Sequence, residues 1–348
     1  MQTAQPQITT IIPTYKRPKL LKRTIESVLK QTYSALQVCV YDNASDDETK
    51  DVVGELAAKD SRVKYHAHTE NIGSFQNFQF GLERVDTPFF SFISDDDLLL
   101  PWFYEKVIQA LERNPEAAFF AGSLLYVTSE KKIVKVGIAT QEEEILLPGS
   151  VVVERMLEGT FPLWTSVLFR KKVKEEIGLL DPDVGPFDFD FMLRAATRFS
   201  GVASHHMCAL FYRHASSFSL APELAFVWPG WRKVIEGFKR EEKLPLKMHL
   251  DGEKKIYENV RRMLCLVVLT GLAKKNFAEA KEAAVLLQEL HNHKALKMAF
   301  FLLIGLCARH DFLRKSFAFL LKTSLGLRDS MRKSRWQKRY GNHLQYLD

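Results

Sequence analysis

Short β-rich runs alternate with helical segments through the first half of the chain, and this alternation is the feature that most constrains its fold. Runs rich in Val, Ile and Phe occupy residues 7–13, 36–41, 63–66 and 89–93, and segments with helical spacing of apolar residues lie between them. This order is typical of βαβ units, so it predicts an α/β fold with a mostly parallel sheet and flanking helices. In such sheets, ligands bind beyond the carboxyl ends of the strands.

Polar side chains stand at the ends of these runs. Asp42 ends the second run, Asn71 follows the third, and Ser94-Asp95-Asp96-Asp97 directly follows the fourth. Adjacent carboxylates raise one another's pKa unless a cation is bound, and hard oxygen ligands favour Mg²⁺ or Mn²⁺. The acidic run therefore predicts either a metal-diphosphate site or a solvated turn whose Asp caps a helix that begins near Pro101.

Two further acidic features leave alternatives open. Asp42 is expected to accept hydrogen bonds from a base or a ribose, and Ser45 and Asp46 are expected to cap the next helix. Asp188 and Asp190 begin a later helix, where the helix dipole stabilises carboxylates without any ligand. Asp190 also precedes Arg194 by four residues, which is the spacing of a helical ion pair.

The order and spacing of these motifs resemble family 2 glycosyltransferases over residues 8 to 219. The matching segments are Ile11-Ile12-Pro13-Thr14-Tyr15-Lys16-Arg17, Ser27–Tyr33, Asp42–Ser45, Asn71-Ile72-Gly73, Ser94–Asp97 with Pro101, and Phe187-Asp188 ahead of Arg194. The resemblance implies a GT-A fold, which is Rossmann-like, and inverting transfer of a sugar from a nucleotide-diphosphate donor. It also implies a glycan or lipid-linked acceptor, UDP as the default nucleotide, and a place in cell-surface polysaccharide synthesis.

The resemblance assigns roles to individual residues. Asp188 matches the general base, and Phe187 stands where a second acidic residue is often found. Asp96 matches the last carboxylate of the DxD motif, whose first acidic position is Ser94 here, and would bind Mg²⁺ or Mn²⁺; Asp97 and His214 are further candidate ligands. The donor is expected to contact Pro13, Thr14, Tyr15, Arg17, Asp42, Asn71, Gly73, Asn77 and Asp95. The acceptor is expected to contact Trp164 and Asp190, and core packing is the alternative for Trp164.

Charge is distributed unevenly, with a net −6 for residues 1–230 and +13 for residues 231–348. The expected division is a catalytic domain at residues 1–220 and a basic helical region at residues 221–348. Residues 295–340 combine apolar helical faces with Lys, Arg and Trp336, which predicts contact with an anionic membrane surface. Acceptor contacts, a homo-oligomer contact and a solvated basic tail are alternatives. Nucleic acid is not expected as a partner, because no recognised binding motif accompanies the charge.

The scattered positions of four cysteines, the lack of a signal pattern at the N-terminus and the shortness of the apolar segment 299–308 predict a cytoplasmic protein. The basic residues within 295–340 add the expectation of a peripheral place on the inner face of the plasma membrane. A nucleotidyltransferase acting on sugar phosphates would share the acidic metal site. Such enzymes usually open with a Gly-rich, Arg-containing loop, whereas this chain has Pro13-Thr14-Tyr15-Lys16-Arg17-Pro18. A non-catalytic nucleotide-sugar-binding scaffold is the other alternative, and the presence of both Asp96 and Asp188 argues against it.

Overall fold

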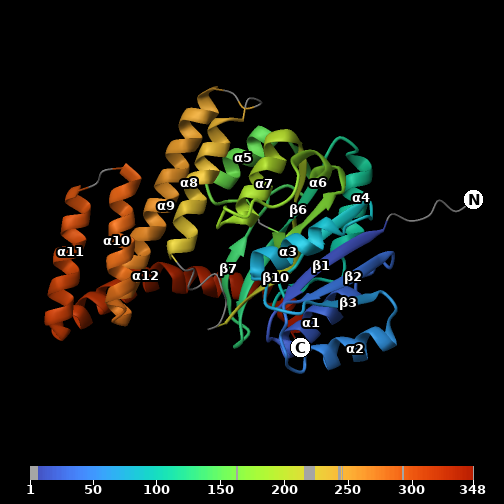
Figure 1. Cartoon of the computed structure of the whole chain (residues 1–348), viewed down its shortest axis with the longest axis horizontal. Coiled ribbons are helices and arrows are strands. Elements are labelled where there is room, and N and C mark those ends of the chain that lie inside the picture. Colours follow the sequence, from blue (N-terminus) through green and yellow to red (C-terminus); the bar gives the residue numbers. More distant parts are fainter. Residues whose placement is uncertain are drawn as a thin grey trace, which may run out of the picture. The chain divides into compact units, whose positions relative to one another are not determined.

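The computed structural model describes residues 7–161, 164–214, 224–241, 244, 246–291 and 294–347, without the side chains of 224–229, 246–247, 288–291, 294–297 and 317–331. The chain divides into two compact units (Figure 1). The sheet unit comprises residues 1–182, 187–216 and 339–348, and the helical unit comprises residues 183–186 and 217–338. The last ten residues of the chain therefore belong to the sheet unit.

A ten-stranded sheet forms the core of the sheet unit. Its order is β3-β2-β1-β4-β9-β6-β10-β5, with β7 beside β6 and β8 beside β10. The pairing is parallel among β3, β2, β1 and β4 and between β6 and β10, and antiparallel elsewhere. The strands are β1 (Ile8–Thr14), β2 (Leu36–Asp42), β3 (Val63–Ala67), β4 (Phe89–Phe92), β5 (Leu98–Leu99), β6 (Phe119–Thr128), β7 (Ile133–Gly137), β8 (Ile145–Leu147), β9 (Val167–Arg170) and β10 (Gly201–Arg213). The predicted α/β architecture is confirmed.

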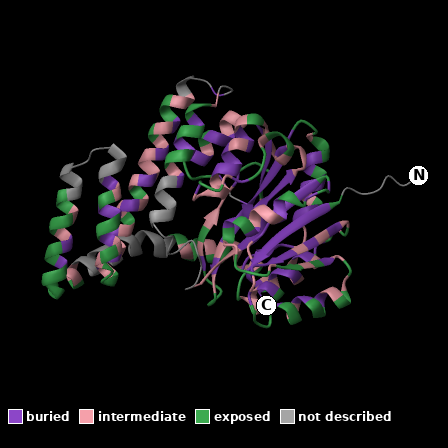
Figure 2. Cartoon of the chain, in the orientation of Figure 1, coloured by how far each residue is buried: buried purple, intermediate pink, exposed green. Residues whose placement is uncertain are grey.

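The position of β1 in the sheet follows from its composition. All seven of its residues are buried, and β-branched side chains fill most of its positions, as suits a strand covered on both faces. Figure 2 shows the same burial along the neighbouring strands. Thr14 is paired with Asp42 across the parallel β1–β2 ladder, so the ends of β1, β2 and β4 lie at one edge of the sheet.

Seven helices flank this sheet in the described part of the sheet unit. They are α1 (Pro18–Leu29), α2 (Thr49–Lys59), α3 (Ser74–Glu83), α4 (Phe103–Arg113), α5 (Gly149–Leu157), α6 (Lys172–Ile177) and α7 (Phe187–Arg198). Pro18 begins α1, a position where its missing N–H costs no hydrogen bond. Gly81 lets α3 approach β1 closely, because a Cβ there would lie 2.5 Å from a methyl carbon of Ile11.

The start of α2 differs from the sequence prediction. The helix begins at Thr49, whose backbone N–H donates to the carboxylate of Asp47 at 2.8 Å. The prediction that Ser45 and Asp46 cap this helix is therefore wrong. The Ser45 hydroxyl instead donates to the Asp42 carboxylate and accepts the backbone N–H of Lys16.

The helical unit contains α8 (Leu224–Lys239), α9 (Leu246–Lys274), α10 (Phe277–His291), α11 (Lys294–Arg309) and most of α12 (Asp311–Tyr340). This confirms the predicted helical C-terminal region. No helix in the described ranges is both long and apolar enough to cross a membrane. The 3₁₀ segment η3 (Gly341–Leu347) follows α12 and packs on the sheet unit, where Trp102 contacts the rings of His343 and Tyr346.

Candidate active site

The acidic run lies at an edge where several strands end together. Because β9 is antiparallel to both β4 and β6, and β10 is parallel to β6, the strands β4, β6 and β10 run in the same direction as β1. Their carboxyl ends therefore share one edge of the sheet. Ligands of open α/β sheets bind at this edge.

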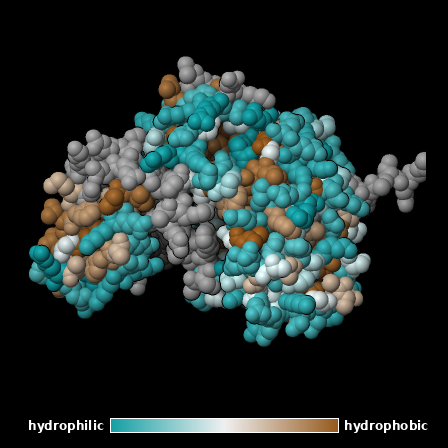
Figure 3. Space-filling model, viewed as in Figure 1, coloured by the Kyte–Doolittle hydropathy of each residue, from teal (hydrophilic) through white to brown (hydrophobic). Residues whose placement is uncertain are grey.

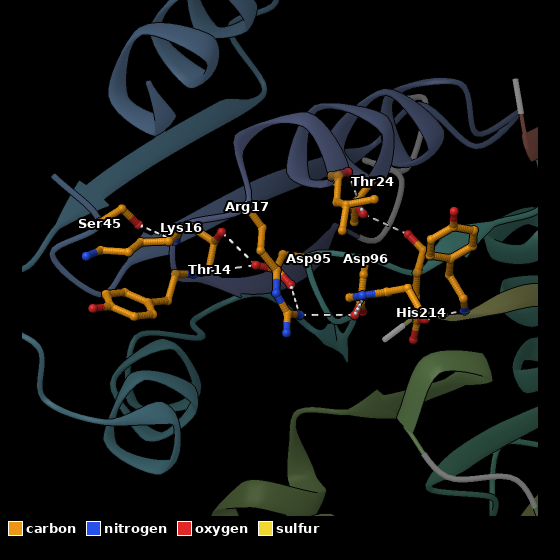
Figure 4. A network of polar contacts seen from close by, with 12 residues as sticks. Thr14, Lys16, Arg17, Thr24, Ser45, Asp95, Asp96 and His214 are labelled. Carbon is orange, nitrogen blue, oxygen red and sulfur yellow. Dashed lines mark hydrogen bonds and ion pairs between the residues drawn. The ribbon is translucent and has the colours of Figure 1, made fainter. Parts of the chain in front are cut away.

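Arg17 joins the first two carboxylates of the run (Figure 4). Its Nη1 atom lies 3.1 Å from Asp95 Oδ1 and 3.0 Å from Asp96 Oδ2. The Thr14 hydroxyl donates to Asp95 Oδ2 at 2.8 Å, and His214 Nε2 lies 2.9 Å from Asp96 Oδ2. One network of polar contacts thus joins the ends of β1, β4 and β10. It consists of the predicted residues Thr14, Arg17, Asp95, Asp96 and His214.

Burial is the main influence on the pKa of Asp95. Only 5% of the residue is exposed, and this burial raises the pKa of its carboxyl to about 6. The positive charge of Arg17 lowers that pKa and the charge of Asp96 raises it. The ionised form of Asp95 therefore depends on the guanidinium beside it, which is the cation that this cluster of carboxylates requires.

Asp97 is turned into the protein. Its carboxylate oxygens accept hydrogen bonds from the Thr165 hydroxyl at 2.7 Å and the Tyr212 backbone N–H at 2.9 Å. Its carbonyl accepts a hydrogen bond from the Thr24 hydroxyl at 2.8 Å. Complete burial, followed by the charge of Asp96, raises the pKa of Asp97 well above its ordinary value. These bonds give Asp97 the geometry of a residue that fixes the acidic loop rather than one that meets a ligand.

Asp42 is also bonded within the protein. Its Oδ1 atom accepts hydrogen bonds from the backbone N–H and the hydroxyl of Ser45, and its Oδ2 atom accepts one from the Tyr65 hydroxyl at 2.7 Å. The Ser45 hydroxyl oxygen accepts the backbone N–H of Lys16 at 2.9 Å. This oxygen links the loop after β2 to the loop after β1. A carboxylate can accept about four hydrogen bonds, so Asp42 retains capacity for a ligand.

Both of these loops contain strained backbone. Lys16, Ala44 and Asp46 have φ angles of +54°, +57° and +49°, which non-glycine residues adopt at an energetic cost. Strained conformations of this kind cluster at ligand sites, where surrounding bonds hold them in place. The Ser45 hydrogen bonds supply that restraint here.

Asn43 is a residue of the site that the sequence predictions missed. Its side chain donates to Asn71 Oδ1 at 2.9 Å and accepts the backbone N–H of Ile72 at 2.8 Å. The same Asn71 oxygen accepts the N–H of Gly73, whose φ of +86° suits glycine. A hydrogen bond with Asn71 lowers the pKa of Tyr15, whose residue is 41% exposed. The sequence did offer a signal for Asn43, because this residue directly follows Asp42 at the end of β2.

Asn77 supports this group from the interior. It is 2% exposed, donates to the Tyr41 carbonyl at 2.8 Å and lies 3.0 Å from His68 Nε2. Pro13 is buried within β1 and pairs with Tyr41. Four of the predicted donor residues lie in the surface loops, namely Tyr15, Arg17, Asn71 and Gly73. The other five are buried, namely Pro13, Thr14, Asp42, Asn77 and Asp95.

Asp188 stands in the first turn of α7. The backbone N–H of Phe189 donates to its Oδ1 atom at 2.8 Å, and burial raises the pKa of its carboxyl. Burial raises the pKa of Tyr126, the charge of Arg213 lowers it, and the charges of Asp97 and Asp188 add smaller increases. A carboxyl group with a raised pKa is better matched to proton abstraction near neutral pH.

The two residues predicted to contact the acceptor are engaged elsewhere. Trp164 is 7% exposed and stacks on Phe92 with ring centroids 4.1 Å apart, so core packing is the alternative that the structure supports. Its buried indole N–H has no hydrogen-bond partner in the described residues. Asp190 accepts a hydrogen bond from Arg194 Nε at 2.7 Å, which confirms the predicted helical ion pair. Arg194 also donates to the carbonyl of Ile177, so the pair fastens α7 to the end of α6.

Two cations flank Tyr126, and the sequence predictions did not connect them. Lys135 Nζ lies 4.9 Å from the ring centroid and the Arg213 guanidinium carbon lies 5.7 Å from it. Burial and the charge of Arg213 lower the pKa of Lys135. The buried Nε of Arg213 has no hydrogen-bond partner among the described residues. Lys135 gave no sequence signal, because the β6–β7 hairpin alone brings it beside Tyr126.

The donor set for a divalent metal is small. Asp96 supplies a carboxylate and His214 an imidazole, which are ligand types that Mn²⁺ and related ions accept. No group of three or more His, Cys, Asp and Glu suited to a metal occurs in the described ranges. These two side chains fit an ion that takes its remaining ligands from water and a diphosphate, as Mg²⁺ commonly does.

Comparison with known proteins agrees with this architecture. Solved structures with the GT-A fold superpose on most of the chain. TarS of S. aureus in complex with UDP-GlcNAc has a TM-score of 0.64 at 14% identity, over 91% of this chain and 92% of that chain. The mannosyltransferase PcManGT of Pyrobaculum calidifontis in complex with GDP-Man and Mn²⁺ has a TM-score of 0.50 at 16% identity, over 97% and 89%. The sheet unit therefore has the GT-A fold.

Residues 9–178 match the model of the glycosyl transferase family 2. This part of the chain belongs to that family, as the sequence motifs indicated. The GalNAc(5)-diNAcBac-PP-undecaprenol beta-1,3-glucosyltransferase of Campylobacter jejuni is 36% identical over 105 residues, which are 30% of this chain and 34% of that protein. A glycosyltransferase of Haemophilus influenzae is 27% identical over 132 residues, or 38% and 41%. The chain thus aligns with about two fifths or less of the length of these relatives.

Proposed function

We propose that the chain transfers a sugar from a nucleotide-diphosphate donor, by default a UDP-sugar, to a hydroxyl of a glycan or lipid-linked acceptor in cell-surface polysaccharide synthesis. One observation carries the proposal. In a domain that matches family 2, Arg17 contacts the carboxylates of both Asp95 and Asp96, and His214 contacts that of Asp96. These contacts lie where β1, β4 and β10 end, at the edge of the sheet that binds ligands. The UDP-GlcNAc bound to TarS supports UDP, and the Campylobacter relative's name supports a lipid-linked acceptor. The family match favours this activity over a nucleotidyltransferase.

The donor would lie over the loops after β1 and β2. Tyr15 and the loop of Asn71 and Gly73 offer an exposed ring and polar groups for the nucleoside, and Asp42 offers a carboxylate for its base. Asp95 would meet the ribose or the sugar through the oxygens that Thr14 and Arg17 orient. Asn77 and Asp97 would position these loops from within, because their polar atoms bond to the protein.

Positive charge is available for the diphosphate. Asp96 and His214 would hold Mg²⁺ or Mn²⁺, which when bound neutralises the charge that develops on the leaving nucleoside diphosphate. Arg17 contributes a fixed cation beside both carboxylates. Lys135 and Arg213 supply a second cationic pair, and we assign them to a phosphate group of the bound substrates.

Asp188 would act as the general base of an inverting transfer. Its carboxylate takes the proton of the acceptor hydroxyl, the oxygen forms a bond to the anomeric carbon, and the bond from that carbon to the diphosphate breaks on the opposite face. A hydroxyl is a weak nucleophile at neutral pH, so a positioned base contributes about 10²–10⁴-fold to the rate. The raised pKa of Asp188 favours this role.

The test is substitution of this base. Asp188→Asn keeps an oxygen that can accept the Phe189 N–H and so preserves the start of α7. With a panel of nucleotide sugars, we expect kcat to fall by about 10²–10⁴-fold while UDP affinity, measured by calorimetry, is unchanged. Asp51→Asn is the matched control, because Asp51 is an exposed acid in the first turn of α2. Near-normal turnover of Asp188→Asn would remove the assignment, and binding of the donor without any turnover of the wild type would favour a scaffold.

A further inference from the structure

One face of α11 exposes a stripe of apolar side chains. The exposed fractions are 65% for Met298, 37% for Phe301, 66% for Leu302 and 49% for Leu306. Spacings of three and four residues place these side chains along one side of a helix. Ile304 and Cys307 lie on the opposite side and are 1% and 2% exposed. The helix therefore packs by one face and leaves an apolar face outside.

Two further exposed apolar residues follow at the start of α12. Phe312 is 79% exposed and Leu313 is 44% exposed. Single exposed apolar residues are ordinary on protein surfaces, but a contiguous group marks an interaction surface. Six such residues occur here within sixteen positions. Figure 3 shows apolar side chains gathered on the part of the helical unit that α11 occupies.

Basic residues surround this group in the sequence. Residues 294–338 contain eleven Lys and Arg and two Asp, which gives a net charge of +9. Arg309 is exposed at the end of the stripe. Asp311, at the start of α12, is within 3.5 Å of side-chain nitrogens of Lys275, Arg314 and Lys315, so its negative charge is compensated.

We infer that the α11 face formed by Met298, Phe301, Leu302 and Leu306, together with the exposed Phe312 and Leu313 that follow it, docks on an anionic lipid surface. Apolar side chains flanked by many basic residues are the pattern of helices that lie in a membrane interface. A second copy of the chain would bring two regions of net +9 together, and like charges oppose that contact. An anionic lipid surface attracts them. Docking would hold the enzyme near a lipid-linked acceptor. This role of the docking rests on the proposed function, whereas the binding to lipid does not.

The experiment uses the full chain and three substitutions on the face, Met298→Gln, Leu302→Gln and Leu306→Gln together. Truncation is avoided because residues 339–348 belong to the sheet unit. In flotation with vesicles of equal parts phosphatidylcholine and phosphatidylglycerol at low salt, we expect the wild type to bind and the triple variant to bind at least about tenfold less. Leu250→Gln is the matched control, because Leu250 is 67% exposed at the start of α9. Binding should fall with pure phosphatidylcholine and with added salt.

Several results would overturn this inference. One is a wild type that does not float, and another is a triple variant that floats as well as the wild type, since charge alone would then account for binding. A wild-type dimer in light scattering that the triple variant dissociates would instead assign the face to a second copy. Flotation requires no turnover, so it can succeed where the Asp188→Asn test of function fails, and the reverse also holds.

Discussion

Replacing Asp95 with asparagine is expected to stabilise the protein at neutral pH and to weaken donor binding. Asp95 is almost completely buried, and its ionised carboxylate is held by Thr14 and Arg17. Asparagine has nearly the same shape and can still accept a hydrogen bond through its carbonyl oxygen. It removes the buried charge, and it also removes the negative group that fixes Arg17.

The magnitude follows from the raised pKa. The pKa of about 6 lies about two units above the ordinary value of 3.8, and each unit corresponds to about 1.4 kcal/mol, so the ionised form costs about 3 kcal/mol in the folded state. Because the folded state binds the proton more tightly, the free energy of unfolding decreases as the pH rises from about 4 to about 6. Above that range the full cost remains.

Urea unfolding at several pH values measures this effect. The free energy of unfolding of Asp95→Asn minus that of the wild type should grow from near zero at about pH 4 to as much as about 3 kcal/mol above about pH 6. Asp60→Asn is the control of opposite sign, because Arg62 lowers the pKa of Asp60. A difference that does not change with pH, or a variant less stable than the wild type at pH 7, would refute the reasoning.

Two further predictions concern the C-terminal segment and the proposed metal ligand Asp96. Deleting residues 341–348 removes the buried Leu344 and Leu347, so the free energy of unfolding should fall by about 3–6 kcal/mol, and an unchanged urea midpoint would contradict this. Asp96→Ala should weaken UDP binding in the presence of Mn²⁺ at least about tenfold, as measured by calorimetry, with little change in EDTA. Equal Mn²⁺ dependence in the variant and the wild type would exclude Asp96 as a metal ligand.

The local pattern of the sequence was sufficient for much of the fold. The predicted strands at residues 7–13, 36–41, 63–66 and 89–93 correspond to β1, β2, β3 and β4, because each is a short run of apolar and β-branched residues. Strands β5 and β8 are only two and three residues long, and their pairing with β10 depends on distant contacts. Such short strands have no periodicity of their own to recognise.

The sequence by itself determined that carboxylates would stand at the ends of parallel strands, because strand order and residue spacing are local properties of the chain. Only the tertiary structure decided what each carboxylate does. Asp97 is turned inward by Tyr212, which is 115 residues away, and Arg17 reaches Asp95 across 78 residues. Adjacent residues with the same side chain thus acquire different roles, since burial and long-range partners set the charge, the pKa and the accessibility of each one.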